Sequence, residues 1–166
     1  MSGYDFQHLK VLIADDSRHI RALVGTFLRS FGVRFVSEAA DTETAFSEVV
    51  SFGPDLIIVD WNMPSTNGID LVKRIRRSPD TPNPYVPIVM LTGYTEIFRV
   101  KEARDCGINA FLAKPVSANA LYKRLVGVVD DQRPYVRSNE FFGPCRRAGR
   151  GDDYGGADRR AARRAH

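Results

Sequence analysis

The chain has 166 residues, of which 43% are hydrophobic and 27% are charged, values typical of a soluble globular domain and not of a fully disordered chain. No apolar run approaches the ~20 residues of a membrane-spanning helix, and residues 1–10 lack the apolar core of a signal peptide, so we expect no membrane insertion and a cytoplasmic location. The two cysteines, Cys106 and Cys145, are too few for a disulfide framework.

The net charge of +4 comes from the end of the chain. Residues 132–166 contain nine arginines and four acids, whereas residues 1–131 contain 15 basic and 16 acidic residues. The composition changes at the same point, from apolar runs with polar punctuation to a segment rich in Gly, Pro, Arg and Asp. We therefore predict a compact domain over residues 1–130 and an arginine-rich tail over residues 131–166 that is disordered until a ligand binds.

Five strands alternate with five helices in the predicted domain. The predicted strands cover residues 9–15, 34–40, 56–60, 86–91 and 109–113. The predicted helices cover residues 17–31, 41–51, 67–77, 95–105 and 117–129, the third of them with a basic outer face. Five consecutive strand–helix units predict an α/β fold, a doubly wound parallel sheet with helices on both faces. The first, third and fourth strands are nearly unbroken aliphatic runs, as expected for strands buried on both faces.

Polar residues that could take part in binding or catalysis follow four of these strands. Asp15 and Asp16 end the first strand, Asp60 ends the third, Thr92 follows the fourth and Lys114 the fifth. The carboxyl ends of parallel strands meet at one edge, where such folds place their functional site. Three carboxylates there would repel one another, and a divalent cation with oxygen ligands, Mg²⁺, relieves that repulsion. Lys114 and Thr92 could then hold phosphoryl oxygens while a carboxylate attacks as nucleophile.

Each of these residues alone has an ordinary explanation, because an aspartate after a strand is usually a turn residue or a helix cap. Their joint occurrence, in this order, resembles the receiver domain of bacterial response regulators, the CheY-like family. The resemblance covers about residues 8–130 and implies the flavodoxin-like strand order 2-1-3-4-5. It implies Asp60 as the phosphoacceptor for a histidine kinase, within the segment Asp60-Trp61-Asn62-Met63-Pro64.

The same resemblance assigns roles to the other residues of the edge. Asp15 and Asp16 would bind the metal together with Asp60, and Asn62 would add its backbone carbonyl. Thr92 would be the switch hydroxyl and Lys114 the lysine that senses the phosphoryl group, with a cis bond to Pro115. Phe111 would be the aromatic residue that moves inward on activation. The protein is thus expected to be a binding switch and not a turnover enzyme.

The tail contains the pattern RRAxR twice, thirteen residues apart. The arginines of the two copies are Arg146, Arg147 and Arg150, then Arg159, Arg160 and Arg163. Acids and a tyrosine, including Asp153 and Tyr154, lie between them. Three interpretations are open: an inert solvated tail, a nucleic-acid-binding tail, or a site for a guanine nucleotide. Arginine can read the guanine edge with two parallel hydrogen bonds, and the acids make nucleic acid the less favoured partner because they repel its backbone.

An RxxxR spacing also occurs in PilZ-type sites for cyclic di-GMP, a ligand with two equivalent halves. Behind an intact receiver and the segment Phe141-Phe142-Gly143-Pro144, the repeated motif resembles the CheY-like c-di-GMP effectors of the Cle group. That resemblance implies c-di-GMP as the effector ligand and c-di-GMP-dependent binding to the flagellar motor switch protein. The alternatives are a receiver with a nucleic-acid-binding tail and a chemotaxis-type receiver with an inert tail.

Overall fold

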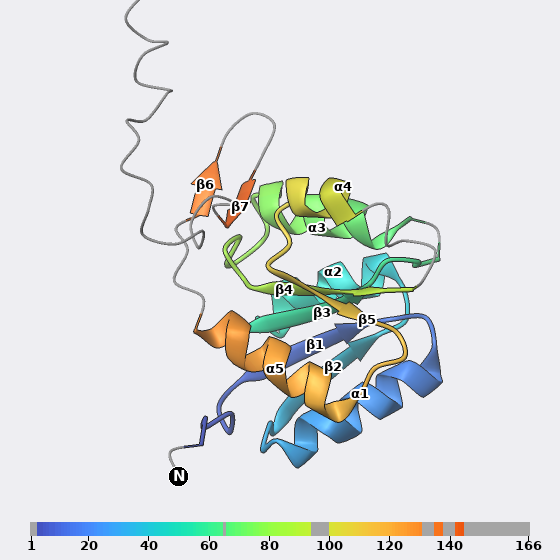
Figure 1. The fold of residues 1–166 in the computed structure, drawn as a ribbon. Coiled ribbons are helices and arrows are strands. Elements are labelled where there is room, and N and C mark those ends of the chain that lie inside the picture. Colours follow the sequence, from blue (N-terminus) through green and yellow to red (C-terminus); the bar gives the residue numbers. More distant parts are fainter. Residues whose placement is uncertain (1–2, 65, 94–99, 131–134, 138–141, 145–166) are drawn as a thin grey trace, which may run out of the picture.

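The computed structural model describes residues 3–64, 66–93, 100–130, 135–137 and 142–144. Its centre is a five-stranded parallel sheet of order β2-β1-β3-β4-β5, which confirms the expected doubly wound α/β fold (Figure 1). The strands are β1 (Lys10–Ala14), β2 (Phe35–Ala39), β3 (Leu56–Asp60), β4 (Ile88–Thr92) and β5 (Ala110–Ala113). The helices are α1 (Arg18–Ser30), α2 (Thr42–Ser51), α3 (Gly68–Arg77), α4 (Val100–Asp105) and α5 (Ala118–Val129).

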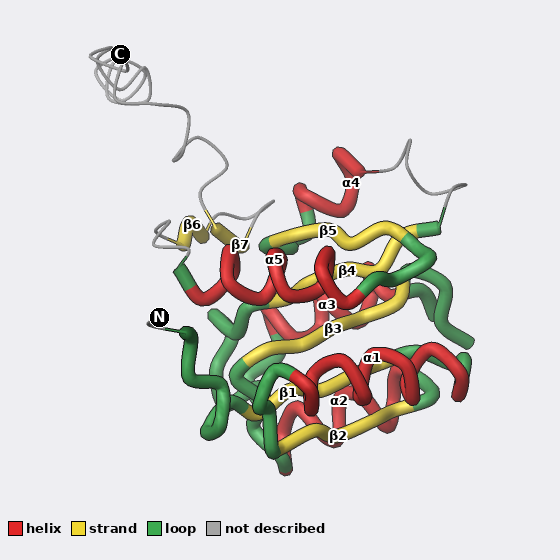
Figure 2. The backbone as a smooth tube through the Cα atoms, turned by 60° about the horizontal axis from the view of Figure 1, so that its bottom comes forward, coloured by secondary structure: helices red, strands yellow, loops and turns green. Residues whose placement is uncertain are grey.

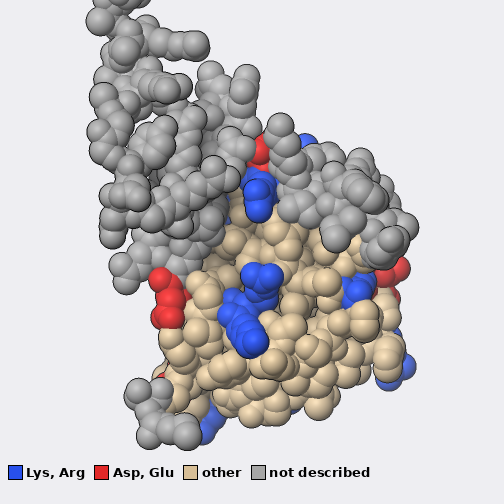
Figure 3. Space-filling model, viewed as in Figure 1, with Lys and Arg blue, Asp and Glu red and all other residues tan. Residues whose placement is uncertain are grey.

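The helices cover both faces of the sheet, α1 and α5 on one side and α2, α3 and α4 on the other (Figures 1 and 2). Alternate residues of each central strand face opposite layers. Val11 and Ile13 therefore pack with the residues of α1 and α5, whereas Leu12 packs with those of α2 and α3. Burial on both faces explains why the central strands are apolar throughout. Figure 3 shows a cluster of basic side chains over α5, where Lys123 and Arg124 are exposed.

Side-chain caps fix where four of the helices begin. The side chains of Ser17, Asp41, Asn67 and Ser117 each accept a hydrogen bond from a backbone N–H three residues on. Such caps satisfy donors that the first helical turn leaves without partners. After α1, Gly32 adopts a φ of 96°, a left-handed conformation that glycine reaches without a steric penalty. These local signals place the loops that carry the polar residues at the carboxyl edge of the sheet.

The helix predicted with a basic outer face exposes Lys73, Arg74 and Arg77, whereas Arg76 is buried at 2% exposure. Its guanidinium donates hydrogen bonds to the carbonyl oxygens of Gly107 at 2.9 Å, Pro84 at 2.8 Å and Val86 at 2.5 Å. Arg76 thus ties α3 to the loop before β4 and to the loop before β5.

Two short strands lie within the predicted tail. β6 (Tyr135–Arg137) and β7 (Phe142–Pro144) form an antiparallel pair. Tyr135, Val136 and Phe142 are of residue types that favour strands, whereas Gly143 and Pro144 of β7 are not. β7 lies against α3 (Figure 1). The other residues of 131–166 lie outside the described part of the chain, as does the predicted beginning of the fourth helix at Thr95.

In the part of the chain that the structure describes, the helices are all too short or too polar to cross a membrane.

Candidate functional site: an acidic pocket at the carboxyl edge of the sheet

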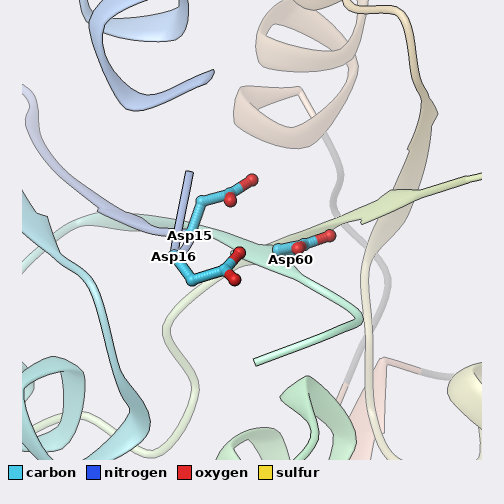
Figure 4. Close-up of side chains that lie close together, drawn as sticks. All are labelled: Asp15, Asp16 and Asp60. Atoms are coloured by element: carbon cyan, nitrogen blue, oxygen red, sulfur yellow. The ribbon is translucent and has the colours of Figure 1, made fainter. Parts of the chain in front are cut away.

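Three aspartates converge where β1 and β3 end. One carboxylate oxygen from each of Asp15, Asp16 and Asp60 lies within 4.8 Å of the others (Figure 4). Asp15 is fully buried and Asp60 is 3% exposed, whereas Asp16 is exposed at the mouth of the pocket. Parallel pairing of β1 with β3 brings the two strand ends together, as the sequence predicted.

Lys114 supplies the positive charge of the pocket. Its Nζ lies 2.8 Å from Oδ1 of Asp60 and 3.3 Å from Oδ2 of Asp15. The backbone N–H of Lys114 donates to the carbonyl of Thr92 at 2.9 Å, which continues the pairing of β5 with β4 beyond the last strand residue. The peptide bond from Lys114 to Pro115 is cis, as expected. One ammonium therefore faces two buried carboxylates, and Asp16 lies beside them.

The pKa values in the pocket follow from this crowding. Burial raises the pKa of Asp60, and the negative charges of Asp15 and Asp16 raise it further, while the hydrogen bond and the charge of Lys114 act in the opposite direction. Burial also raises the pKa of Asp15, against the lowering effect of the Ser17 N–H and of Lys114. Burial tends to lower the pKa of Lys114, but the two carboxylates outweigh it and the net pKa is raised. Among the described residues, the pocket thus holds more negative charge than Lys114 alone can balance.

A magnesium ion fits this donor set. Oδ2 of Asp15 is buried and, apart from the Lys114 ammonium 3.3 Å away, meets no hydrogen-bond donor among the described residues, so it can still ligate a cation. Its other oxygen, Oδ1, accepts from the Ser17 N–H at 2.8 Å, which fixes the orientation of the carboxylate. Mg²⁺ prefers carboxylate oxygens and keeps several waters, and the exposed side of the pocket at Asp16 leaves room for water.

The remaining predicted residues of the receiver occupy the same edge or lie near it. Thr92, 7% exposed, is the last residue of β4, and Asn62 is exposed in the loop after β3. Phe111 on β5 is partly buried and packs against the core on the α2–α3–α4 side of the sheet. Their roles as switch and ligand residues stay predictions. The tail residues Arg146, Arg147, Arg150, Asp153, Tyr154, Arg159, Arg160 and Arg163 lie outside the described residues.

The sequence analysis missed Gly68, which determines how the phosphoacceptor loop packs. A Cβ at this position would lie 2.1 Å from the backbone carbonyl oxygen of Asp60, so α3 can approach the end of β3 only with glycine at its first residue. The N–H of Gly68 donates to the carbonyl of Trp61 at 2.8 Å. The sequence gives only a weak indication that glycine is required here, because the close contact is with a residue eight positions earlier.

Comparison with known proteins agrees with this geometry. Residues 11–126 match the model of the response regulator receiver domain, and the chain belongs to that family. It is 34% identical to the chemotaxis protein CheY-3 of Vibrio cholerae over 119 residues, which are 72% of this chain and 90% of that protein. It is 32% identical to the chemotaxis protein CheY of Pseudomonas aeruginosa over 117 residues, 70% of this chain and 93% of that protein.

Solved structures show the same fold. The structure of the chemotaxis response regulator CheY4 of Vibrio cholerae superposes with a TM-score of 0.66 at 35% identity, over 72% of this chain and 98% of that one. The receiver domain of the sensor histidine kinase PA1611 of Pseudomonas aeruginosa superposes with a TM-score of 0.65 at 26% identity, over 74% and 98% of the two chains. That structure contains a magnesium ion coordinated in its active-site cleft.

Proposed function

We propose that this receiver domain accepts a phosphoryl group on Asp60 from a histidine kinase and acts as a cytoplasmic binding switch, not as a turnover enzyme. The observation that carries the proposal is the contact of one ammonium, that of Lys114, with both Asp60 and Asp15 beside the exposed Asp16. Three carboxylates beside one ammonium repel one another, whereas a bound cation balances their charge and allows a phosphoryl group to bind.

In the proposed reaction, a carboxylate oxygen of Asp60 attacks the phosphorus and forms an acyl phosphate, while the bond from phosphorus to the imidazole nitrogen of the kinase breaks. Mg²⁺, held by Asp15, Asp16, Asp60 and the carbonyl of Asn62, would neutralise charge on the phosphoryl oxygens. Lys114 already contacts Oδ1 of Asp60, and after transfer its ammonium would contact a negatively charged phosphoryl oxygen instead. The hydroxyl of Thr92, at the end of the neighbouring strand, would donate to another phosphoryl oxygen and so report phosphorylation to Phe111.

Acetyl phosphate with Mg²⁺ tests this step without knowledge of the kinase. The wild-type protein should gain one phosphoryl group by intact mass, and EDTA should prevent it. Asp60→Asn should abolish labelling, while Asp70→Asn, at an exposed position of α3, should leave it unchanged. Equal labelling of wild type and Asp60→Asn would place the phosphoacceptor elsewhere. Thr92→Ala should still be labelled but should lose the phosphorylation-dependent change in partner affinity.

We further propose that the tail binds c-di-GMP and that the output is binding to the flagellar motor switch protein. The repeated RRAxR motif supports a ligand with two equivalent guanine halves, and the similarity to two chemotaxis proteins supports an output in motility. The first motif begins two residues after β7, which lies against α3. The exposed bases Lys73 and Arg77 of α3 add positive charge to that side of the domain.

Titration calorimetry with c-di-GMP, GTP and a short RNA distinguishes the two ligand classes. A reader of guanine depends on the planar fork of arginine, so replacement of Arg146, Arg147, Arg150, Arg159 and Arg160 by lysine should reduce c-di-GMP affinity by about tenfold or more. A polyanion binder would tolerate lysine and would lose affinity steeply with salt. Asp153→Ala and Tyr154→Ala should weaken c-di-GMP binding, whereas Asp153→Ala should strengthen RNA binding. Wild-type affinity of the five-lysine variant for c-di-GMP would refute guanine reading.

A further inference from the structure

Arg21 of α1 contacts the backbone of Asp15 and Asp16. Its Nη1 donates to the carbonyl oxygen of Asp15 at 2.7 Å and to that of Asp16 at 3.2 Å. Its Nε lies 3.7 Å from Oε2 of Glu38 on β2, and its side chain is 15% exposed. One guanidinium thus joins the loop that carries two of the three aspartates to a helix on one side and a strand on the other.

These carbonyls need a partner because the strand pairing has ended. The last residue of β1 in register with both neighbours is Ala14, opposite Ala39 and Val59. Beyond it, the N–H of Asp15 still donates to the carbonyl of Ala39, while the carbonyl of Asp15 turns to Arg21. A backbone carbonyl in a half-buried place is costly without a donor, and a guanidinium gives it a charge-assisted bond. Arg21 therefore supplies the donor for the part-buried carbonyl of Asp15 and makes a longer, exposed bond to the carbonyl of Asp16.

Fixed carbonyls restrain the backbone from which the two carboxylates project. The carboxylate of Asp15 is also held by the Ser17 N–H and lies beside Lys114. Asp16 is exposed, and the bond from Arg21 to its carbonyl is a restraint on its backbone. The geometry points to Arg21 as a positioning residue for magnesium: it holds the backbone of Asp15 and Asp16 so that their carboxylates face Asp60.

The positive charge of Arg21 could oppose a cation, but Glu38 lies beside the guanidinium and offsets that charge. Loss of a residue that orients metal ligands from outside the coordination sphere typically reduces metal affinity by about 10–100-fold. Since the carboxylate of Asp15 has further restraints, we expect the lower end of this range. The inference concerns the metal site and holds whether or not the tail binds a nucleotide.

Magnesium titration of the unphosphorylated protein tests it, followed by the fluorescence of Trp61, the single tryptophan, which is 1% exposed and adjacent to Asp60. Arg21→Met should raise the magnesium dissociation constant about tenfold. Arg21→Lys keeps a charged donor and should recover a large part of the affinity. Arg18→Met, at an exposed position of the same helix, should stay within about twofold of wild type.

Two further measurements separate positioning from a merely structural role. In acetyl phosphate labelling, Arg21→Met should need more Mg²⁺ for half-maximal rate but reach the wild-type rate at saturation. Urea unfolding in EDTA should show that the variant is folded under the conditions of the titration. A dissociation constant that is unchanged or lower in folded Arg21→Met would overturn the inference. So would a reduced maximal rate with an unchanged magnesium midpoint, or an equal loss of affinity in Arg18→Met. Because no phosphodonor is present in the titration, its outcome is independent of whether Asp60 is the phosphoacceptor.

Discussion

Addition of one methyl group at Gly68 should have the opposite effect on stability from the same addition at Gly127. The Cβ of an alanine at position 68 would lie 2.1 Å from the carbonyl oxygen of Asp60 and 3.1 Å from its carbonyl carbon. Both are backbone atoms at the end of a central strand and cannot rotate away. At Gly127, on the exposed side of α5, a Cβ would have nothing within 4 Å. Both glycines are helical, so they differ in the space around them.

The magnitudes follow from this difference in space. Relief of the overlap at position 68 requires α3 or the end of β3 to move by about 1 Å, and overpacking of this kind costs about 1–3 kcal/mol. The movement also strains the hydrogen bond from the Gly68 N–H to Trp61, which contributes about 1 kcal/mol. Alanine loses less backbone entropy on folding than glycine does, which offsets about 0.4–1 kcal/mol of this cost. We expect Gly68→Ala to lower the free energy of unfolding by about 2–3 kcal/mol.

Gly127→Ala has only the favourable contributions and should raise the free energy of unfolding by about 0.5–1 kcal/mol. Urea unfolding followed by circular dichroism measures both values against wild type. Gly68→Ala should also be labelled more slowly by acetyl phosphate, because the strained atom belongs to the backbone of Asp60. If Gly68→Ala proves as stable as wild type, the close approach of α3 to β3 does not constrain the loop of the phosphoacceptor, and the reasoning is wrong.

Three further predictions concern buried charge and helix capping. Arg76→Met leaves several buried carbonyls without donors and should cost about 3 kcal/mol or more by urea unfolding, whereas Arg77→Met, at the exposed neighbouring position, should stay within about 0.5 kcal/mol of wild type. The pKa of Asp60 is raised in the folded state, so protonation favours folding and ionisation at higher pH costs stability. Asp60→Asn should therefore be more stable than wild type at pH 7 in EDTA, an advantage that disappears as the pH falls below about 4; a constant advantage at all pH values would contradict this. Ser117→Ala should lower thermal stability by about 1 kcal/mol through loss of the N-cap of α5, and an unchanged melting temperature would deny the cap any weight.

The elements that could be predicted from the sequence are those with local causes. Ser17 and Ser117, the first residues of two predicted helices, are the N-caps of helices that begin one residue later, because a cap satisfies donors within the next turn. The acidic pocket was also predictable, since parallel strands bring their carboxyl ends to one edge whatever the details of packing. Asp15 and Asp60 needed only their position after an apolar run to be assigned to the same site.

Residues whose partners lie beyond the adjacent helical turn could not be placed in this way. The partner of Gly68 is a carbonyl on the neighbouring strand, and that of Arg21 is the backbone of the acidic loop, so neither contact leaves a pattern in the adjacent sequence. Arg76 left a signal that its charge concealed. It lies four residues after Val72 and seven after Ile69, on the apolar face of α3, so helical periodicity alone would have placed it in the interior, although its residue type indicated solvent.

Helix α3 contacts backbone carbonyl groups near both of its ends. At its first residue the helix touches the carbonyl of Asp60, and near its last turn Arg76 donates to Gly107 in the loop before β5. Ten helical residues span about 15 Å. The helix therefore connects the end of β3 with the loop before β5, and β7 lies against the same helix. A change of side chain at Gly68 or Arg76 alters these contacts without touching the carboxylates of the pocket.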